Sequence, residues 1–339
     1  MNLDYNKEKS HDLRGEVCLS GAMPAKVFDC WTKLWERLKK HEWSTHTFIA
    51  KVQDYQSDIA NVIKKGFSEL GVLPEEFKGK TILLKPNLVQ SADGAVHINT
   101  HPLVVRGTVE AFLSMGAGKI VVAEGPGHSR DSLHVLEECG MAEVLVEDRI
   151  PFIDLNFDDI YCLPNAGRWS GLKTLSLPVS IKKADWVVSM PKMKTHHWAG
   201  VTLSMKNLFG VMPGIVYGWP KNVLHLEGIE KSIFDINATL RPDFAIVDGI
   251  VGMAGDGPIM GSPHDAGVIV MGRNLPAVDS TCCRIMGIDP RKVRYLAKAL
   301  KRLGPIDERN IYQSGETVES VRTDFELVDD IPAHMGIRI

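Results

Sequence analysis

One short stretch of the chain, residues 184–214, concentrates the side chains whose types and spacing could do chemistry. It opens with an apolar run, Trp186 to Met190, of the kind that forms a buried parallel strand, and a proline ends that run. Basic and hydroxyl residues follow at once, namely Lys192, Lys194, Thr195, His196 and His197. Because ligands in open α/β sheets bind beyond the carboxyl ends of the strands, we expect the chemistry of this protein here.

The two adjacent histidines suit proton transfer, because imidazole titrates near neutral pH. One of His196 and His197 is therefore a candidate acid–base group or metal ligand. Neighbours in an extended chain point to opposite sides, and the sequence leaves open which of them faces the site. We expect Lys192 and Lys194 to differ as well, one facing the crevice and the other solvated.

The next residues could bind a ligand or simply begin a helix. Thr202 and Ser204 are candidate caps of a helix or turn, with Lys206 and Asn207 on the side of the ligand. A purely structural interpretation, capping plus a surface lysine, fits these four residues equally well. Together with the histidines and Lys194, Lys206 completes the set of candidate catalytic residues.

Polar groups also follow other predicted strands. Lys85 and Asn87 come after an apolar run and form a pair of donors suited to a carboxylate or phosphate, although a snorkelling lysine is the alternative. Glu124, which Gly125 follows, ends a second apolar run, and Asp248 ends a third apolar run. The two carboxylates could bind a divalent metal or orient a lysine or histidine. In a parallel sheet these strand ends share one edge, so we expect the groups to meet there.

The elements that must position these residues follow a strand–helix rhythm. Strands about 35 residues apart, with amphipathic helices between them, indicate an α/β fold with a mostly parallel sheet covered by helices on both faces. Residues 150–180 are less regular and predict a smaller lobe. We divide the chain into a helical appendage (1–45), the α/β domain (46–315) and a C-terminal tail packed on that domain (316–339).

The N-terminal appendage carries the pattern of an amphipathic helix. A start at Pro24 would place Val27, Trp31, Leu34 and Leu38 on one face, with charged residues of both signs elsewhere. Such a face needs a partner surface. We expect it to pack on its own domain or to form a homo-oligomer with a second copy.

Composition excludes several classes of protein. The formal net charge is -3, from 39 basic and 42 acidic residues, which gives no footprint for nucleic acid or for an anionic membrane. No signal segment or membrane-spanning run is visible, so a cytoplasmic location is expected. The six cysteines include no ligand spacing for an iron–sulfur cluster, and none is expected.

Several blocks together resemble the domain-of-unknown-function family numbered 362. They are KPNLV at 85–89, THP at 100–102, EGPG at 124–127, PKMKTHHWAGVTLSMKNLFG at 191–210, DGIVGMAGDGP at 248–258 and AVDS at 277–280. The order and spacing fit across residues 46 to about 315. The resemblance implies little about chemistry. Many members carry an added ferredoxin-like module with cysteine ligands, which this chain lacks.

A local likeness to the lactate racemase family concerns mechanism. The run from His196 to Lys206, followed by a proline–glycine pair, is similar to that family's stretch, in which a histidine is an acid–base group and a lysine carries a nickel-pincer nucleotide. The resemblance implies that His196 transfers a proton and that Lys206 anchors a cofactor or substrate. The chain departs from that family at Leu203 and Ser204, where the family has two glycines.

The preferred hypothesis is an enzyme of isomerase, racemase or lyase type that binds a small anionic ligand, a carboxylate or a phosphate. Lysines would stabilise developing negative charge and a histidine would move a proton, with a divalent metal as an optional helper. Two alternatives remain open. The protein could be a non-catalytic carrier or assembly factor for an anionic cofactor or metal, or a redox enzyme that works with a separate ferredoxin.

Overall fold

The computed structural model describes residues 45–90, 94–127 and 131–339. The predicted helix of the N-terminal appendage, and with it the predicted contact for a homo-oligomer, lies outside the described residues. The fold and the site below are built from the remaining chain.

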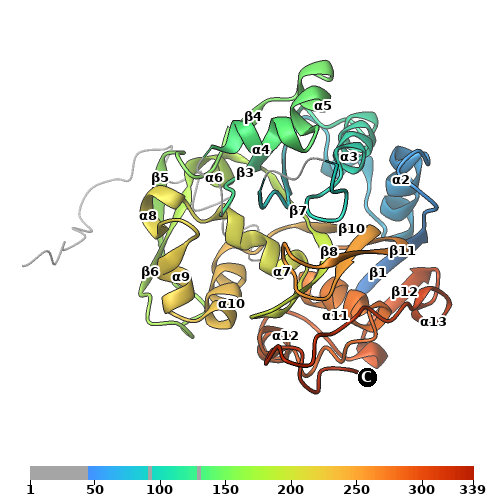
Figure 1. The fold of residues 1–339 in the computed structure, drawn as a ribbon. Helices are drawn as coiled ribbons and strands as arrows, with labels where there is room; N and C mark the ends of the chain where they lie inside the picture. Colours follow the sequence, from blue (N-terminus) through green and yellow to red (C-terminus); the bar gives the residue numbers. More distant parts are fainter. Residues whose placement is uncertain (1–44, 91–93, 128–130) are drawn as a thin grey trace, which may run out of the picture.

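The centre of the molecule is a large, mostly parallel sheet, as the strand–helix rhythm predicts (Figure 1). The strands that build its central path run in the order β12 (Tyr312–Gly315), β1 (His46–Lys51), β11 (Ser262–Gly272), β10 (Phe244–Ala254), β7 (Trp186–Met190), β2 (Thr81–Pro86), β3 (Lys119–Glu124) and β4 (Phe152–Asp154). Strand β1 is antiparallel to β11, and β11 is antiparallel to β10. From β10 through β4, neighbouring strands of this path are parallel.

Helices cover both faces of the sheet, which confirms the predicted fold class (Figure 1). The strand pleat explains why both faces need cover: in β2, Ile82 and Leu84 enter one hydrophobic cluster and Leu83 enters the other. The first cluster is closed by α2 (Ile59–Glu69), α3 (Pro102–Ser114), α4 (Ser132–Glu138) and α5 (Met141–Glu147). The second is closed by α7 (Ser204–Asn207), α10 (Ile229–Leu240), α11 (Leu275–Ile285) and α12 (Arg294–Ala299).

The irregular region at 150–180 divides between two sheets. Strand β4 joins the edge of the main sheet beside β3. Strands β5 (Ile160–Pro164) and β6 (Thr174–Pro178) form a separate antiparallel pair, followed by the short helix α6 (Val179–Lys183). A smaller lobe therefore lies beside the main sheet, as predicted.

The chain after Pro191 adds two short strands to the main sheet. Residues Lys192–His196 form a strand of their own, β8, which pairs with β10 and turns back into β9 (Gly200–Thr202). Strand β10 pairs with β7 at its start and with β8 further on, and it continues to Ala254. The expectation that Asp248 ends a strand is therefore wrong, because β8 extends the sheet beyond the end of β7.

Candidate active site

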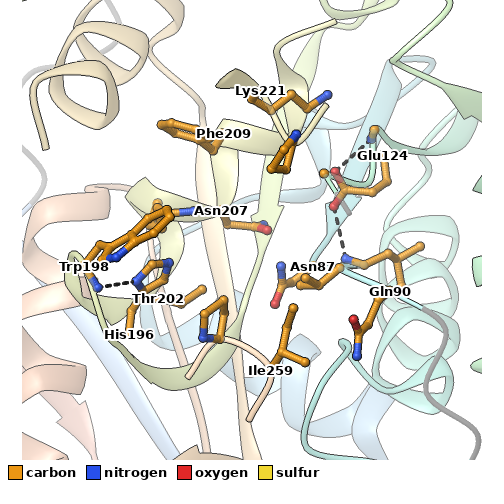
Figure 2. Close-up of a pocket in the computed structure, with 18 of the residues that line it drawn as sticks. Asn87, Gln90, Glu124, His196, Trp198, Thr202, Asn207, Phe209, Lys221 and Ile259 are labelled. Carbon is orange, nitrogen blue, oxygen red and sulfur yellow. Dashed lines mark hydrogen bonds between the residues drawn. The ribbon is translucent and has the colours of Figure 1, made fainter. Parts of the chain in front are cut away.

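A cavity of about 460 Å³ lies at the carboxyl ends of β2 and β3 and is closed by the turn between β8 and β9 and by the hairpin turn between β10 and β11. Figure 2 shows His196 and Trp198 on one side of it and Asn87 and Glu124 on the other. Nine predicted site residues line this cavity, namely Lys85, Asn87, Glu124, Gly125, His196, His197, Thr202, Lys206 and Asn207. Lys192, Lys194, Thr195, Ser204 and Asp248 are not among its lining residues.

Lys85 and Glu124 form a buried ion pair in the wall of the cavity, with 2.6 Å between Lys85 Nζ and Glu124 Oε2. Lys85 Nζ also donates to the carbonyl oxygen of Asn207 at 2.5 Å and to its Oδ1 at 2.8 Å. Asn207 in turn donates its Nδ2 to the carbonyl of Lys85. An ammonium has three N–H donors, and these partners use all of them. Lys85 therefore holds β2, β3 and α7 together and has no donor left for a ligand.

Gly210, in the 3₁₀ turn η2 (Leu208–Val211), is needed because its backbone lies directly against this ion pair. A Cβ at this position would be 2.6 Å from Lys85 Nζ and closer still to Glu124 Oε1. No side chain fits there unless the ion pair moves. The glycine that ends the block KNLFG is thus explained by packing.

Of the three lysines that line the cavity in the described structure, Lys206 is the one whose ammonium is least occupied by other groups. Within the described part of the chain it has no carboxylate partner and no hydrogen-bond acceptor, and its Nζ lies 4.6 Å from the centre of the Phe209 ring. Burial and the charge of Lys85 lower the pKa of Lys206 to about 8. The side chain can therefore meet an incoming anion with its charge uncompensated.

Lys221, which sequence reasoning did not select, also lines the cavity. It is buried, has a left-handed backbone (φ 68°), and donates its Nζ to Asn156 Oδ1 and to the carbonyl of Met212 at 2.6 Å. Burial lowers its pKa to about 8. It lies in a loop rich in glycine and proline, so no periodic pattern marks its side chain as buried.

His196 is buried, and its ring is held in one tautomer by the backbone. The Nδ1 atom accepts from the N–H of Trp198 at 3.0 Å and of Ala199 at 3.3 Å. In the neutral ring the proton must then be on Nε2, which makes this atom a donor. Burial and the charge of Lys206 hold the pKa of His196 well below its ordinary value. His196 is thus arranged as a neutral hydrogen-bond donor.

His197 has the arrangement of a base. Its Nδ1 lies 3.0 Å from Asp256 Oδ1, and a carboxylate can only accept, so the ring proton is on Nδ1 and the lone pair is on Nε2. Asp256 comes from the glycine-rich turn between β10 and β11. Both side chains line the cavity and are partly exposed to solvent. A carboxylate that orients a histidine in this way also stabilises the imidazolium that forms when the ring takes a proton.

Two further polar atoms at the cavity are buried without a hydrogen-bond partner in the described structure. They are Asn87 Oδ1 and Thr202 Oγ1, from opposite sides of the site. A buried polar group without a partner costs free energy, which a bound ligand would recover. Asn87 and Thr202 are therefore well placed to bind a ligand that carries hydroxyl or carboxylate oxygens.

The predicted residues outside the cavity have internal partners. Lys192 and Asp248 form a second buried ion pair at 2.6 Å, and Tyr55 bridges it by accepting from Lys192 at 2.9 Å. Lys194 donates to the carbonyl of Pro258 at 3.1 Å, and Thr195 donates to the carbonyl of Gly255 at 2.7 Å. The expectation that one of the two lysines is solvated is wrong, because both are fully buried. Positions two apart in a strand point to the same side, so alternation along the strand does not turn one of them toward solvent.

Ser204 takes part in a helix start, but its cap comes from another element. The carboxylate of Asp279 in α11 accepts from the N–H groups of Ser204 and Met205, at 2.7 Å and 2.9 Å, and from the Ser204 hydroxyl. Burial raises the pKa of Asp279 to about 7. Asp279 therefore fixes the start of α7, the helix that carries Lys206 and Asn207.

No group of three or more His, Cys, Asp or Glu side chains could hold a metal ion among the residues that the structure describes. The two predicted metal ligands, Glu124 and Asp248, each pair with a lysine in a separate place. In the described part of the chain, the cavity offers a lysine without a counter-ion, an oriented histidine, and an amide and a hydroxyl oxygen without partners. This arrangement is suited to binding an anion and moving a proton.

The fold and the cavity define an α/β protein with a cavity at the carboxyl edge of its sheet. The chain belongs to the family described as a domain of unknown function (DUF362), whose model matches residues 82–284. This confirms the resemblance that the sequence blocks indicate.

Two individual proteins are also similar to this chain. A thylakoid-associated protein of Synechocystis sp. (strain ATCC 27184 / PCC 6803 / Kazusa) is 28% identical over 236 residues, which are 67% of this chain and 68% of that protein. A crystal structure of a Thermotoga maritima protein is similar at a TM-score of 0.34 and 14% identity. That match covers 66% of this chain and 58% of the other. Within the described residues, no helix has the length and apolar character needed to cross a bilayer.

Proposed function

We propose that this protein is an enzyme that binds a small carboxylate and transfers a proton at the carbon next to it, as isomerases and racemases do. The observation that carries the proposal is the pairing of two features in one cavity: Lys206 has no counter-ion among the residues that the structure describes, and His197 is oriented by Asp256. The substrate carboxylate would lie against Lys206. Asn87 and Thr202 would bind its remaining oxygens.

The proposed reaction assigns different tasks to the two histidines. The substrate C–H bond breaks, its proton goes to His197 Nε2, and the electron pair moves into the carboxylate as an enolate. Asp256 stabilises the imidazolium, while Lys206 and the Nε2–H of His196 stabilise the negative charge. Return of the proton to carbon completes the cycle. The tautomer of His196 thus favours His197 as the acid–base group.

Deuterium incorporation tests this proposal. The purified protein is incubated in deuterated buffer with a panel of 2-hydroxy acids, and loss of the signal of the C–H next to the carboxylate is followed by proton NMR. We expect exchange in at least one acid, and a rate at least about 100-fold lower in His197→Gln. The control is His134→Gln, an exposed histidine that does not line the cavity. Equal rates in the two variants would remove His197 from the mechanism.

A non-catalytic carrier is the second candidate, favoured by the buried, unpartnered atoms of Asn87 and Thr202, which a retained ligand would satisfy. Native mass spectrometry of freshly purified protein separates the two functions. A ligand, cofactor or metal held at full occupancy, together with no exchange in any acid, supports the carrier and contradicts the enzyme. An empty protein that exchanges added acid supports the enzyme.

The location of the protein belongs to the same proposal. We place this enzyme in the cytoplasm, since its net charge of -3 provides no general attraction to an anionic membrane. The Synechocystis relative is named a thylakoid-associated protein, so association with a membrane is the alternative to test. Fractionation of a lysate decides between the two locations. If the protein is recovered in the membrane pellet and a salt wash releases it, a purely cytoplasmic location is contradicted.

A further inference from the structure

One wall of the cavity is built from aromatic rings that touch in sequence. The centre of the His197 ring is 4.9 Å from that of Trp198, Trp198 is 5.4 Å from His225, and His225 is 5.1 Å from Phe209. These rings come from the β8–β9 turn, from η2 and from α9 (Asn222–Leu226). Three separate segments therefore converge to make the ring wall, which we define as His197, Trp198, Phe209 and His225.

The outer part of the ring wall, at Trp198, is poorly covered by the protein itself, whereas Phe209 is buried. Trp198 lines the cavity and yet leaves 59% of its surface exposed, and Met260 on the hairpin turn leaves 79% exposed. In Figure 2, Phe209 and Ile259 lie at opposite sides of the site. Covering this apolar surface with a ligand would lower the free energy by about 25 cal/mol for each Å² removed from water.

The size of the cavity also exceeds what a simple acid needs. A volume of about 460 Å³ is in the range of sites that enclose ligands with a sizeable organic body. A three-carbon acid held at Lys206 would leave the ring wall facing water. The substrate should therefore carry an apolar group in addition to its carboxylate.

Lys206 fixes the distance between the two parts of such a ligand. Its Nζ lies 4.6 Å from the centre of the Phe209 ring, so the positive charge sits at the end of the ring wall. A ligand whose ring reaches the Phe209 end of the wall must then have its carboxylate within a few bonds of that ring. Offset or edge-to-face packing of that ring on Trp198 and Phe209 adds to the free energy of burial.

We propose that the substrate is an aromatic carboxylate, with a planar ring against the ring wall and a carboxylate, one to three bonds away, against Lys206. This inference rests on the proposed function, because it names the class of acid that the same site takes. Trp198 is its specificity-determining residue. Aliphatic acids with the same carboxylate head group bind more weakly than the aromatic acids.

Isothermal titration calorimetry with three 2-hydroxy acids tests the inference without relying on turnover. The probes are lactate, 3-phenyllactate and 3-cyclohexyllactate, which share one head group. We expect phenyllactate to bind at least about ten-fold more tightly than lactate, and more tightly than cyclohexyllactate. Trp198→Ala should weaken phenyllactate about ten-fold and leave lactate unchanged. Phe157→Ala, an exposed aromatic residue that does not line the cavity, is the matched control.

The outcomes separate this inference from the proposed function. Equal affinities for lactate and phenyllactate, both weakened by Lys206→Gln, would overturn the aromatic class while leaving the carboxylate site in place. Equal affinities for the phenyl and cyclohexyl acids would show that the wall selects apolar volume and would also overturn it. Tight binding of phenyllactate through Trp198, with no deuterium exchange in any acid, supports the aromatic class and contradicts the proposed proton transfer.

Discussion

Lys85 of β2 and Glu124 of β3 form a buried ion pair across two neighbouring parallel strands, with 2.6 Å between Nζ and Oε2. Each partner also binds the segments that close the site: Lys85 donates to Asn207, and Glu124 accepts from the N–H of Leu88 and of Gly125. The pair therefore ties together the segments of one cavity wall, including α7, which carries Lys206.

Removing one partner of this pair should be strongly destabilising. Lys85→Met leaves the Glu124 carboxylate buried without its counter-ion, and we expect a loss of about 3–5 kcal/mol in the free energy of unfolding. The double variant Lys85→Met, Glu124→Gln removes both charges and should recover part of that loss. Urea unfolding followed by circular dichroism measures both. A loss below about 1 kcal/mol in the single variant would contradict a structural role for the pair.

Gly210 should not tolerate even one added methyl group. In Gly210→Ala the new Cβ would overlap the ion pair, so we expect lower stability and loss of ligand binding. Gly127→Ala is the matched control, because it lines the same cavity and its Cβ would be 3.7 Å from the nearest atom, in Pro220. Thermal unfolding compares the two variants. The account fails if Gly210→Ala unfolds at the same temperature as Gly127→Ala.

Affinity for a carboxylate should fall as the pH rises through about 8. The pKa of Lys206 is lowered to about 8, so its ammonium is present below this pH and is lost above it. Lys206→Arg stays charged and should keep its affinity to higher pH. Titrations of phenyllactate at pH 6 to 10 measure this difference. The pKa of Lys221 is also about 8, so Lys221 would explain a remaining fall in the affinity of Lys206→Arg above this pH. Identical pH profiles for the two proteins would exclude Lys206 as the anchor.

Asp279 should make stability fall between about pH 4 and pH 7. Its pKa is about 7 in the folded protein, above the ordinary value of 3.8, so the folded state binds this proton more tightly than the unfolded state. The contribution is complete below pH 4 and is lost as the pH rises through 7. Compared with Asp279→Asn, the wild type should therefore lose unfolding free energy over this range. The exposed Asp159→Asn should follow the wild type, and parallel curves for all three proteins would contradict the prediction.

The sequence was sufficient to predict the strands that carry the site and the edge where they meet. Apolar runs mark β2, β3 and β7 clearly because both faces of the sheet are buried. Polar residues at the ends of such runs stand out, so Lys85, Asn87 and Glu124 could be recognised, although Lys85 and Glu124 pair with each other in the structure. Their partners could not, since Lys85 meets Asn207 across 122 positions of the chain.

The rest of the site depends on contacts that no local pattern encodes. The proposed role of each histidine depends on the partner of its Nδ1. For His196 the partner is the backbone of the following turn, and for His197 it is Asp256 from a distant hairpin. Lys221 and the ring wall come from loops and short helices without periodicity. Lys192 and Lys194 alternate along an extended segment, which suggests that one faces the crevice and the other is solvated, whereas strand β8 buries both.

The central claim is that Lys206 binds the carboxylate whose neighbouring carbon exchanges its proton. The most direct measurement is the rate of deuterium incorporation into the acid that the wild type exchanges fastest, in Lys206→Gln and in Lys64→Gln, an exposed lysine on α2 that does not line the cavity. The account predicts a rate at least about 100-fold lower in Lys206→Gln, since a charge that stabilises the enolate is lost, and an unchanged rate in Lys64→Gln. Equal rates in both variants would contradict it.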